Sequence, residues 1–378
     1  MFDQEFLFSK MSIEERINYL KEHSPLTDDD LKLIHDGNGL TLPVASSMIE
    51  NVIGIYSLPY SIAPGFLING KELSVPMVGE EPYVPSSTSN GALLAKKNGG
   101  FIASNTGSVM IGQVQLSCIS NPYTAKLNIL ENKREIIEIA NRVDPVLISF
   151  GGGCIDVEAY IRDSPMETFL VVHLIINVKD AMGAQAINAM TEAVSNKLEE
   201  LSGGIANIKV LSNLAIYRIV RSRVKIKKED IGGEACVDKI VSAWEFARAD
   251  QFRATTHNKG VMNGIIPVVI ATGNDTRAVE SGVHSYACYG GKYKPVTTWE
   301  KNNDGDLEGM IEVPMAVGIV GGTTKIHPLA QLSLKLMDVH SATELAEIIA
   351  SVGLAANLGV LHSLVTAGLY GDFNAARK

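Results

Sequence analysis

The sequence predicts an α+β fold in which a large helix-rich domain with a mixed sheet is interrupted by a small ferredoxin-like domain of βαββαβ order. Its 378 residues, 46% hydrophobic and 20% charged, are typical of a folded globular protein with two or three domains. Between Gly112 and Arg223 the apolar pattern changes between strand and helix spacing in the order βαββαβ, and the last third has mostly helical spacing. We therefore expect an N-terminal arm and the first part of the large domain in residues 1–110, the small domain in 111–218 and the rest of the large domain in 219–378.

The first part of the chain predicts two short helices followed by a hairpin. Apolar residues repeat at helical spacing over residues 11–23, and a second helix is expected over residues 26–34 behind the cap signal at Thr27. The stretch PYSIAPGFLINGKEL then predicts two strands joined at Asn69 and Gly70, because the dipeptide Asn-Gly favours tight two-residue hairpin turns.

The small domain is predicted as an antiparallel sheet with two helices on one face. The alternating or apolar stretches predict strands over residues 114–119, 156–161, 169–178 and 208–211. Helical spacing predicts helices over residues 132–141 and 181–201.

The rest of the large domain is predicted to be mainly helical. We expect a helix over residues 238–248 and strands over residues 267–271 and 309–317. Pro328 is placed where a helix can begin, and the sequence from Ser341 to Glu344 is a capping box before a long apolar helix. The glycines within SVGLAANLGV indicate that this last helix packs closely against its neighbours.

Charge and composition exclude several classes of function. The net charge is −9 and no basic stripe with interleaved aromatic residues is present, so we expect no nucleic-acid partner. The first residues include acidic ones and no apolar run reaches the roughly 18 residues that span a bilayer, so we expect neither a targeting segment nor a membrane anchor. The four cysteines lie far apart without a CxxC pair, which favours a reducing compartment and a cytoplasmic protein.

The common motifs of nucleotide and metal sites are absent from the sequence. No GxGxxG follows a predicted strand, and neither GxxxxGK[ST] nor HExxH occurs. The eight histidines are scattered, so we expect no metal site.

Two polar clusters in apolar surroundings are candidates for acid–base or phosphate chemistry. Glu80 and Glu81 lie in a loop, where a buried carboxyl would have a raised pKa and could act as a general acid; the alternative is a solvated acidic turn. Asp180–Gln185 lies between a predicted strand and a predicted helix, where small residues let a phosphate approach the free amides of the helix N-terminus. The alternative is that Asp180 only caps that helix.

Two further clusters place a lysine and a carboxylate in neighbouring apolar segments. Lys259 stands between Asn258 and Gly260, and since glycine adds no bulk the ammonium can reach a cavity. Asp275 follows Gly273 and Asn274 and is a candidate to hold that ammonium in place. The alternative is a surface salt bridge.

Eight short motifs that occur in one order over residues 48–368 carry a specific resemblance. Because these motifs occur in the order of the family, the chain strongly resembles class II 3-hydroxy-3-methylglutaryl-coenzyme A (HMG-CoA) reductase. The motifs are Glu50–Gly54 (ENVIG), Pro76–Pro82 (PMVGEEP), Asp180–Ala184 (DAMGA), Leu211–Leu214 (LSNL), Thr256–Gly264 (THNKGVMNG), Ala271–Asp275 (ATGND), Thr297–Glu300 (TTWE) and Gly321–Pro328 (GGTTKIHP).

The resemblance implies an NAD(P)H-dependent oxidoreductase of the mevalonate pathway, in isoprenoid biosynthesis. The family interconverts HMG-CoA with mevalonate and coenzyme A by two hydride transfers through mevaldehyde, which is held at the interface of a homodimer. Glu81 then corresponds to the catalytic acid, Lys259 to the cation beside the substrate oxygen and Asp275 to the carboxylate that holds this lysine. Residues that match positions binding the HMG or thioester portion are Arg253, Asn213 and Asn263.

The resemblance also implies that the small domain binds the nicotinamide cofactor without a Rossmann fold. The residues expected to approach the dinucleotide are Asp180, Met182, Gly183, Ala184, Gln185, Gly151 and Gly152. In members of the family that prefer NADH, an aspartate just before the glycine run contacts the adenosine ribose. Residues 146–150 contain no acid, and because an acid would repel a 2′-phosphate, the resemblance favours NADPH over NADH.

The match breaks at two places. Tyr83 replaces the small residue that often follows the Glu-Pro pair. The family also carries a C-terminal flap with a catalytic histidine, whereas this chain ends in GLYGDFNAARK, so we expect the flap to be absent from it. Two hypotheses follow, an HMG-CoA reductase and a catalytically impaired form that binds HMG-CoA or coenzyme A.

Overall fold

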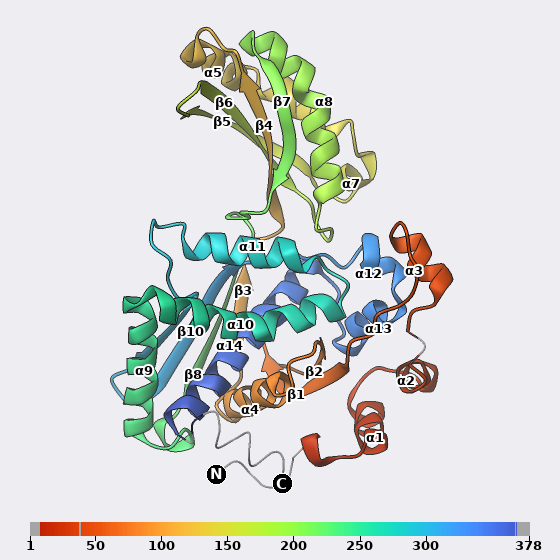
Figure 1. The fold of residues 1–378 in the computed structure, drawn as a ribbon, viewed down its shortest axis with the longest axis vertical. Helices are drawn as coiled ribbons and strands as arrows, with labels where there is room; N and C mark the ends of the chain where they lie inside the picture. Colours follow the sequence, from red (N-terminus) through yellow and green to blue (C-terminus); the bar gives the residue numbers. More distant parts are fainter. Residues whose placement is uncertain (1–7, 38, 367, 369–378) are drawn as a thin grey trace. The chain divides into compact units, whose positions relative to one another are not determined.

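The structure is a computed structural model that describes residues 8–37, 39–366 and 368 (Figure 1). Its chain divides into two compact units. The larger unit comprises Met1–Asn105, Val220–Val313 and Ile319–Lys378, and the smaller one comprises Thr106–Ile219 and Pro314–Gly318. The expected absence of a C-terminal flap rests on residues 368–378, which apart from Gly368 lie outside the described residues.

The smaller unit is built on one antiparallel four-stranded sheet. Its strands β4 (Val109–Ser117), β5 (Gly153–Asp163), β6 (Thr168–Asn177) and β7 (Ile205–Ser212) lie in the order β5-β6-β4-β7. This is the strand order of a split βαβ unit, as the alternating pattern predicts. Helices α5 (Pro122–Glu131), α6 (Lys133–Asn141) and α8 (Ala184–Ser202) pack on its core face through residues such as Ile129, Ile136 and Ile187.

The connection from β4 to β5 contains more helix than the sequence predicts. The single expected helix over residues 132–141 corresponds to α6, but α5 precedes it and the short α7 (Pro145–Ser149) follows it. Both additional helices have proline at their first position, where the missing N–H group costs nothing. These two helices are too short for their apolar residues to show a clear helical pattern in the sequence.

The N-terminal helices and the hairpin of the larger unit are confirmed. Helices α1 (Ile13–His23) and α2 (Asp28–His35) both begin with complete capping boxes, at Ser12 and Thr27, and α3 (Leu42–Met48) follows them. Strands β1 (Tyr60–Ile68) and β2 (Lys71–Val78) are antiparallel. Asn69 and Gly70 join them with φ values of 49° and 82°, as a left-handed two-residue turn requires.

A second sheet of the larger unit has the order β3-β8-β10-β9. Strand β3 (Ile102–Asn105) pairs antiparallel with β8 (Ile219–Ile226), and β9 (Thr297–Lys301) pairs antiparallel with β10 (Leu307–Pro314). The predicted strand over residues 309–317 therefore ends three residues early, at Pro314.

Helices make up most of the larger unit. They are α4 (Val84–Lys97), α9 (Glu234–Ala249), α10 (Gln251–Ala271), α11 (Thr276–Ala287), α12 (Gly322–Ile326), α13 (Pro328–Leu336) and α14 (Ala342–Val365). The prediction of a strand over residues 267–271 is wrong, because these residues form the last turn of α10. A short run of buried β-branched residues fits either structure, and here Val268 and Val269 pack into the core as part of a helix.

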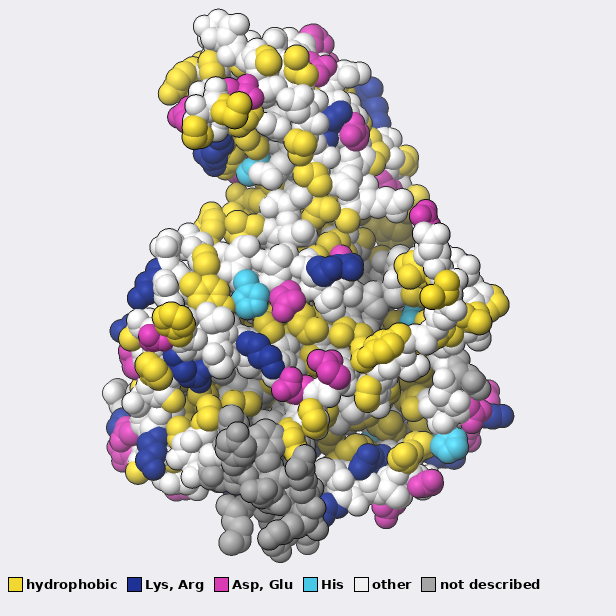
Figure 2. Space-filling view, in the orientation of Figure 1, with side chains coloured by type: hydrophobic (Ala, Val, Ile, Leu, Met, Phe, Trp, Pro, Cys, Tyr) yellow, Lys and Arg dark blue, Asp and Glu magenta, His cyan; other side chains and the backbone are white. Residues whose placement is uncertain are grey.

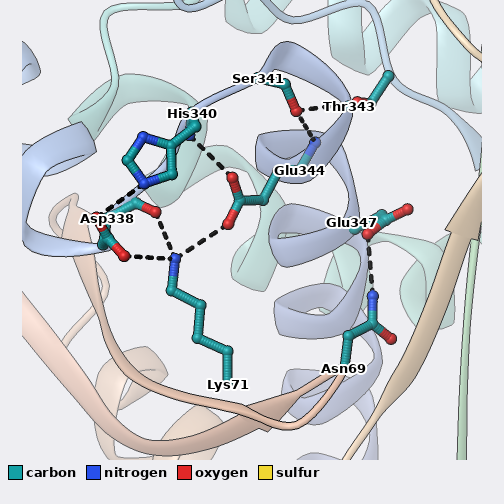
Figure 3. A network of polar contacts seen from close by, with 8 residues as sticks. All are labelled: Asn69, Lys71, Asp338, His340, Ser341, Thr343, Glu344 and Glu347. Atoms are coloured by element: carbon teal, nitrogen blue, oxygen red, sulfur yellow. Dashed lines mark hydrogen bonds and ion pairs between the residues drawn. The ribbon is translucent and has the colours of Figure 1, made fainter.

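The N-terminus of α14 is only half of the predicted capping box. The Ser341 side chain accepts a hydrogen bond from the Glu344 backbone N–H group. The Glu344 carboxylate does not return to Ser341; it accepts bonds from Lys71 on the hairpin and from the His340 backbone (Figure 3). Asp338 also pairs with Lys71, so this network ties the β1–β2 hairpin to the start of α14.

Helix α14 lies at the centre of the larger unit, next to α4 and α10 (Figure 1). Among the described helices it is long and apolar enough to cross a membrane, but 72% of its most apolar window is buried inside the protein, as in a core helix. The predicted close packing is confirmed at its glycines. A Cβ on Gly353 would lie 2.8 Å from Ile265, and one on Gly359 would meet the Ser87 carbonyl.

Gly264 and Gly260 provide a matched test of this packing on α10. A Cβ on Gly264 would lie 2.7 Å from the Ala356 Cβ and 2.8 Å from the Val352 carbonyl, whereas one on Gly260 would meet nothing within 4 Å. We expect Gly264→Ala to lower the free energy of unfolding by about 1–3 kcal/mol through overpacking. Gly260→Ala should leave it unchanged or raise it by about 0.5–1 kcal/mol. Denaturant unfolding measures both, and equal effects would contradict the packing argument.

Candidate functional site

A cavity of about 160 Å³ in the larger unit brings together charged and amide side chains from three segments. Glu80 and Glu81 reach it from the loop after β2, Lys259 and Asn263 from α10, and Glu280 from α11. Lys259 and Asn263 are four residues apart, so they share one face of the helix. The cavity therefore combines carboxylates, an ammonium group and an amide.

Lys259 and Glu81 form an ion pair although 178 residues separate them in sequence. The Lys259 Nζ lies 3.1 Å from the Glu81 Oε2. The side chains of Lys259 and Glu81 are 58% and 51% exposed, so Glu81 is not the buried carboxyl that was one of the two interpretations of this loop. The pair has the form of the surface salt bridge considered as the alternative, but it lies on the wall of a cavity.

Asp275 is placed at the start of α11. Its Oδ1 accepts hydrogen bonds from the backbone N–H groups of Arg277 and Ala278, at 2.9 and 3.2 Å, and pairs with the Arg277 side chain. Burial raises the pKa of Asp275, but the hydrogen bonds and charge of Arg277 outweigh it, so the pKa is lowered overall. The expected pair between Asp275 and Lys259 is not among the ion pairs of the described residues.

The remaining predicted substrate residues lie in different places. Asn263 lines the cavity beside Lys259. Arg253 lies in the first turn of α10, which Asp250 caps, and burial lowers the pKa of Arg253. Asn213 is exposed just after β7 and belongs to the smaller unit.

The residues next to Lys259 attach α10 to the core. The His257 Nε2 lies 2.6 Å from the Thr297 hydroxyl, which lies 3.0 Å from the Asn357 Oδ1. The same Oδ1 accepts a 2.8 Å bond from the Trp299 indole. Asn258 bonds the backbone of Lys294 and Val296 just before β9. Sequence reasoning did not anticipate this network, although two of the eight motifs meet in it.

The direction of each hydrogen bond in this network follows from its chemistry. The Trp299 N–H group can only donate and the Asn357 Oδ1 can only accept, so the Thr297 hydroxyl donates to Asn357. Thr297 therefore accepts from His257, which must carry its proton on Nε2. Burial, and then the charge of Arg253, lowers the pKa of His257 to about 3, so this side chain is neutral.

In the smaller unit the predicted cofactor turn leads into α8. Gly183 is the N-cap of α8, with a φ of 102°, and a Cβ there would lie 2.5 Å from Val178. The N-cap residue is Gly183, three residues after Asp180, so Asp180 is not the N-cap residue of α8. The first-turn amides of a helix attract anions, because they are the positive end of the helix dipole.

The glycine run lies against the same turn. Gly151 has a φ of 74°, and a Cβ there would lie 3.6 Å from the Lys179 Nζ. A Cβ on Gly152 would lie 2.7 Å from the carbonyl oxygen of Asn177, at the end of β6. The structure thus brings Gly151 and Gly152 next to the segment that leads to Gly183. Met182 and Ala184 are half-buried there, and Gln185 is exposed.

Arg218 is a buried residue at this turn that sequence reasoning missed. Its guanidinium donates to the carbonyl oxygens of Ala181 at 3.1 Å, Met182 at 3.4 Å and Val317. Burial lowers the pKa of Arg218 to about 10, opposed by the charge of Asp180. The one available signal was an arginine inside the apolar stretch AIYRIV.

Among the described residues, no group of three or more His, Cys, Asp or Glu side chains is arranged to hold a metal ion.

Comparison with known proteins identifies the family. The family model of hydroxymethylglutaryl-coenzyme A reductase matches residues 12–371. A 3-hydroxy-3-methylglutaryl-coenzyme A reductase from Archaeoglobus fulgidus is 50% identical over 362 residues, which cover 96% of this chain and 83% of that protein. The chain belongs to the HMG-CoA reductase family. A probable HMG-CoA reductase from Borreliella burgdorferi is 32% identical over 335 residues, covering 85% of this chain and 74% of that protein.

Solved structures agree with this assignment. The class II HMG-CoA reductase from Streptococcus pneumoniae, bound to NADPH in open conformations, matches with a TM-score of 0.93 and 39% identity, over 95% of this chain and 99% of that one. The family resemblance and the α+β fold class are thereby confirmed. The HMG-CoA reductase family is one of NAD(P)H-dependent oxidoreductases, so the chain is an enzyme of this class and the binding-only alternative is not favoured.

The buried His257 should make stability fall in mild acid. Its pKa is about 3 in the folded state and near 6.5 when unfolded, so only the unfolded chain takes up the proton as the pH falls below about 6.5. Between pH 7 and pH 5 this should remove about 2 kcal/mol of stability. Denaturant unfolding of wild type and His257→Gln at both pH values measures the effect. The variant should lose about 2 kcal/mol less, and equal losses would contradict the assignment.

Proposed function

We propose that this HMG-CoA reductase interconverts HMG-CoA with mevalonate and coenzyme A by two hydride transfers, with mevaldehyde between them. The observation that carries the proposal is the pairing of Lys259 with Glu81 on the wall of a cavity that Asn263 also lines. An ammonium group and a carboxyl group beside one another are the groups that carbonyl reduction requires.

The two side chains have complementary tasks in this proposal. Hydride addition to the thioester carbon places negative charge on the carbonyl oxygen, and the Lys259 ammonium stabilises that charge. Breaking the carbon–sulfur bond then releases coenzyme A and leaves the aldehyde. Addition of the second hydride makes an alkoxide, which Glu81 in its protonated form converts to the alcohol. When bound, a reduced nicotinamide dinucleotide would supply one hydride, so two such molecules would be used in turn for the two reductions.

The other candidate residues keep the roles that the resemblance implies. Arg253, Asn213 and Asn263 are proposed to bind the HMG or thioester portion of the substrate. Asp275 is proposed to hold Lys259 once the lysine turns from Glu81 towards substrate. In the free protein its carboxylate is occupied by the first turn of α11 and by Arg277.

We propose that a larger cavity of the same unit takes the coenzyme A portion. It has a volume of about 1100 Å³ and extends to α1 and α2. Ser61, Val78, Pro85 and Ile270 line both this cavity and the smaller one, so the two are neighbours. An extended thioester could then place its acyl end beside Lys259 and its longer portion in the larger space.

We propose NADPH as the cofactor, bound by the smaller unit through Asp180–Gln185 and through Gly151 and Gly152. The residues fit a dinucleotide, because the first-turn amides of α8 attract a pyrophosphate and the glycines leave room for it. The Lys179 ammonium beside the glycine run adds positive charge. Residues 146–150 present no acid that would repel a 2′-phosphate.

We further propose that the enzyme is a homodimer in the cytoplasm. Ile49, Ile53 and Tyr56 are 69%, 101% and 90% exposed after α3, and Figure 2 shows hydrophobic side chains gathered at the surface around that helix. Such a patch is typical of a protein interface. All four cysteines are free, which supports a reducing compartment, and cell fractionation would test that location.

Turnover of HMG-CoA by the purified chain tests the proposed reaction. We expect cofactor oxidation with HMG-CoA and with mevaldehyde, and a higher kcat/KM with NADPH than with NADH. Lys259→Ala should lower kcat by about 100- to 1,000-fold, because the developing oxyanion loses its cation. The exposed Lys239→Ala on α9 is the matched control and should leave the rate unchanged. Measurable binding of HMG-CoA without turnover of either substrate would refute the reaction, and a near wild-type rate for Lys259→Ala would refute its role.

Sedimentation of a surface variant tests the dimer. Ile53→Asp places a charge in the exposed apolar segment and should shift the protein from dimer to monomer with loss of activity. Met166→Asp, at a residue that is 95% exposed in the smaller unit, should stay dimeric and active. A wild-type monomer with full activity would contradict the proposal.

A further inference from the structure

We propose that Arg218 is a positioning residue, which holds the turn before α8 in the shape that receives the anionic part of the dinucleotide. This inference rests on the proposed function of the smaller unit. Arg218 is not among the residues that the family motifs mark, and it is not expected to touch the substrate or the cofactor.

The contacts of Arg218 join two segments that are far apart in sequence. Its guanidinium donates to the carbonyl oxygens of Ala181 and Met182, directly before the N-cap of α8, and to that of Val317. Its own backbone carbonyl accepts a 3.0 Å bond from the Met315 N–H group. One residue therefore ties the segment of residues 314–318 to the turn that begins α8.

The segment of residues 314–318 packs directly against this turn. A Cβ on Gly318 would lie 2.6 Å from the Met182 backbone nitrogen and 3.0 Å from the Asp180 carbonyl oxygen. Only a glycine allows this approach. The backbone of Gly318 packs against the turn, and Arg218 donates hydrogen bonds to two of its carbonyls. The carbonyls before α8 therefore have little freedom to rotate.

Burial makes the charge of Arg218 a fixed one. The residue is 3% exposed, so its guanidinium has exchanged water for backbone carbonyl oxygens. A guanidinium presents its N–H groups in a rigid planar fork, which fits several carbonyls at once in a way that a lysine cannot. The charge also lies beside the positive end of the α8 dipole, where it strengthens the attraction for an anion.

The orientation of the α8 amides follows from these contacts. The N-cap of α8 is Gly183, which has no side chain, so the turn before it decides where the first N–H groups of the helix point. If the Ala181 and Met182 carbonyls lost their hydrogen bonds to Arg218, the turn could rotate. The N–H groups at the start of α8 would then no longer converge on one anion. Affinity for the dinucleotide should fall while the substrate cavity of the larger unit is untouched.

Direct binding measurements on the full chain test the inference. NADPH is titrated by fluorescence and HMG-CoA by calorimetry, with wild type, Arg218→Met, Arg218→Lys and the control Arg162→Met, whose arginine is exposed on β5. Arg218→Met should raise the Kd for NADPH about 10- to 100-fold, as loss of hydrogen bonds to a charged group does, and leave the Kd for HMG-CoA within about twofold. Arg218→Lys should give a Kd for NADPH between those of wild type and Arg218→Met, because lysine keeps the charge but lacks the planar guanidinium fork. Arg162→Met should bind both ligands like wild type.

A second variant keeps the test decisive if Arg218→Met does not fold. Gly318→Ala leaves the charge in place but pushes a methyl group into the Met182 amide, so it should weaken NADPH binding and speed hydrogen exchange of the amides at residues 181–187 in the free protein. Unchanged NADPH affinity in the folded variants of Arg218 and Gly318, or an equal loss in Arg162→Met, would overturn the positioning role. A wild-type protein that binds neither NADPH nor NADH would instead overturn the proposed function.

Discussion

The hydrogen-bond chain from His257 through Thr297 to Asn357 is the interaction on which the larger unit depends. It joins α10, β9 and α14 in the core, and Trp299 fixes its direction because an indole can only donate. Loss of any member would leave a buried polar group without a partner, at a cost of about 1–3 kcal/mol. Since Lys259 and Asn263 are on α10, the same chain fixes the position of the cavity wall.

Local signals in the sequence predicted the elements whose form is decided locally. Cap signals predicted α1 and α2, and Asn69 with Gly70 predicted the hairpin. The change between strand and helix periodicity predicted the βαββαβ order. The strand predicted over residues 267–271 was wrong because no local signal decides the structure of that segment. A short apolar run has no period of its own, and packing against the core decides that it continues α10.

The two sites differ in how far the sequence could lead to them. Lys259 and Glu81 were found through the family motifs, but their 3.1 Å approach depends on tertiary folding. Residue spacing could not show that His257 faces the core while Lys259 faces the cavity, because the two stand in one polar motif. Arg218 gave no repeating pattern, and the backbone carbonyls that bind it are invisible in a sequence.

The two positive charges are held in opposite ways, and this suits their tasks. Lys259 and Glu81 are each about half exposed, and an ion pair of that kind is worth only about 0–1 kcal/mol, so substrate can separate the pair at little cost. Arg218 is enclosed by carbonyl oxygens, and moving it would strand a buried charge. A charge that must follow a developing oxyanion is therefore left mobile. A charge that must keep a turn in one shape is buried, so the protein separates reactivity from rigidity by the exposure of each side chain.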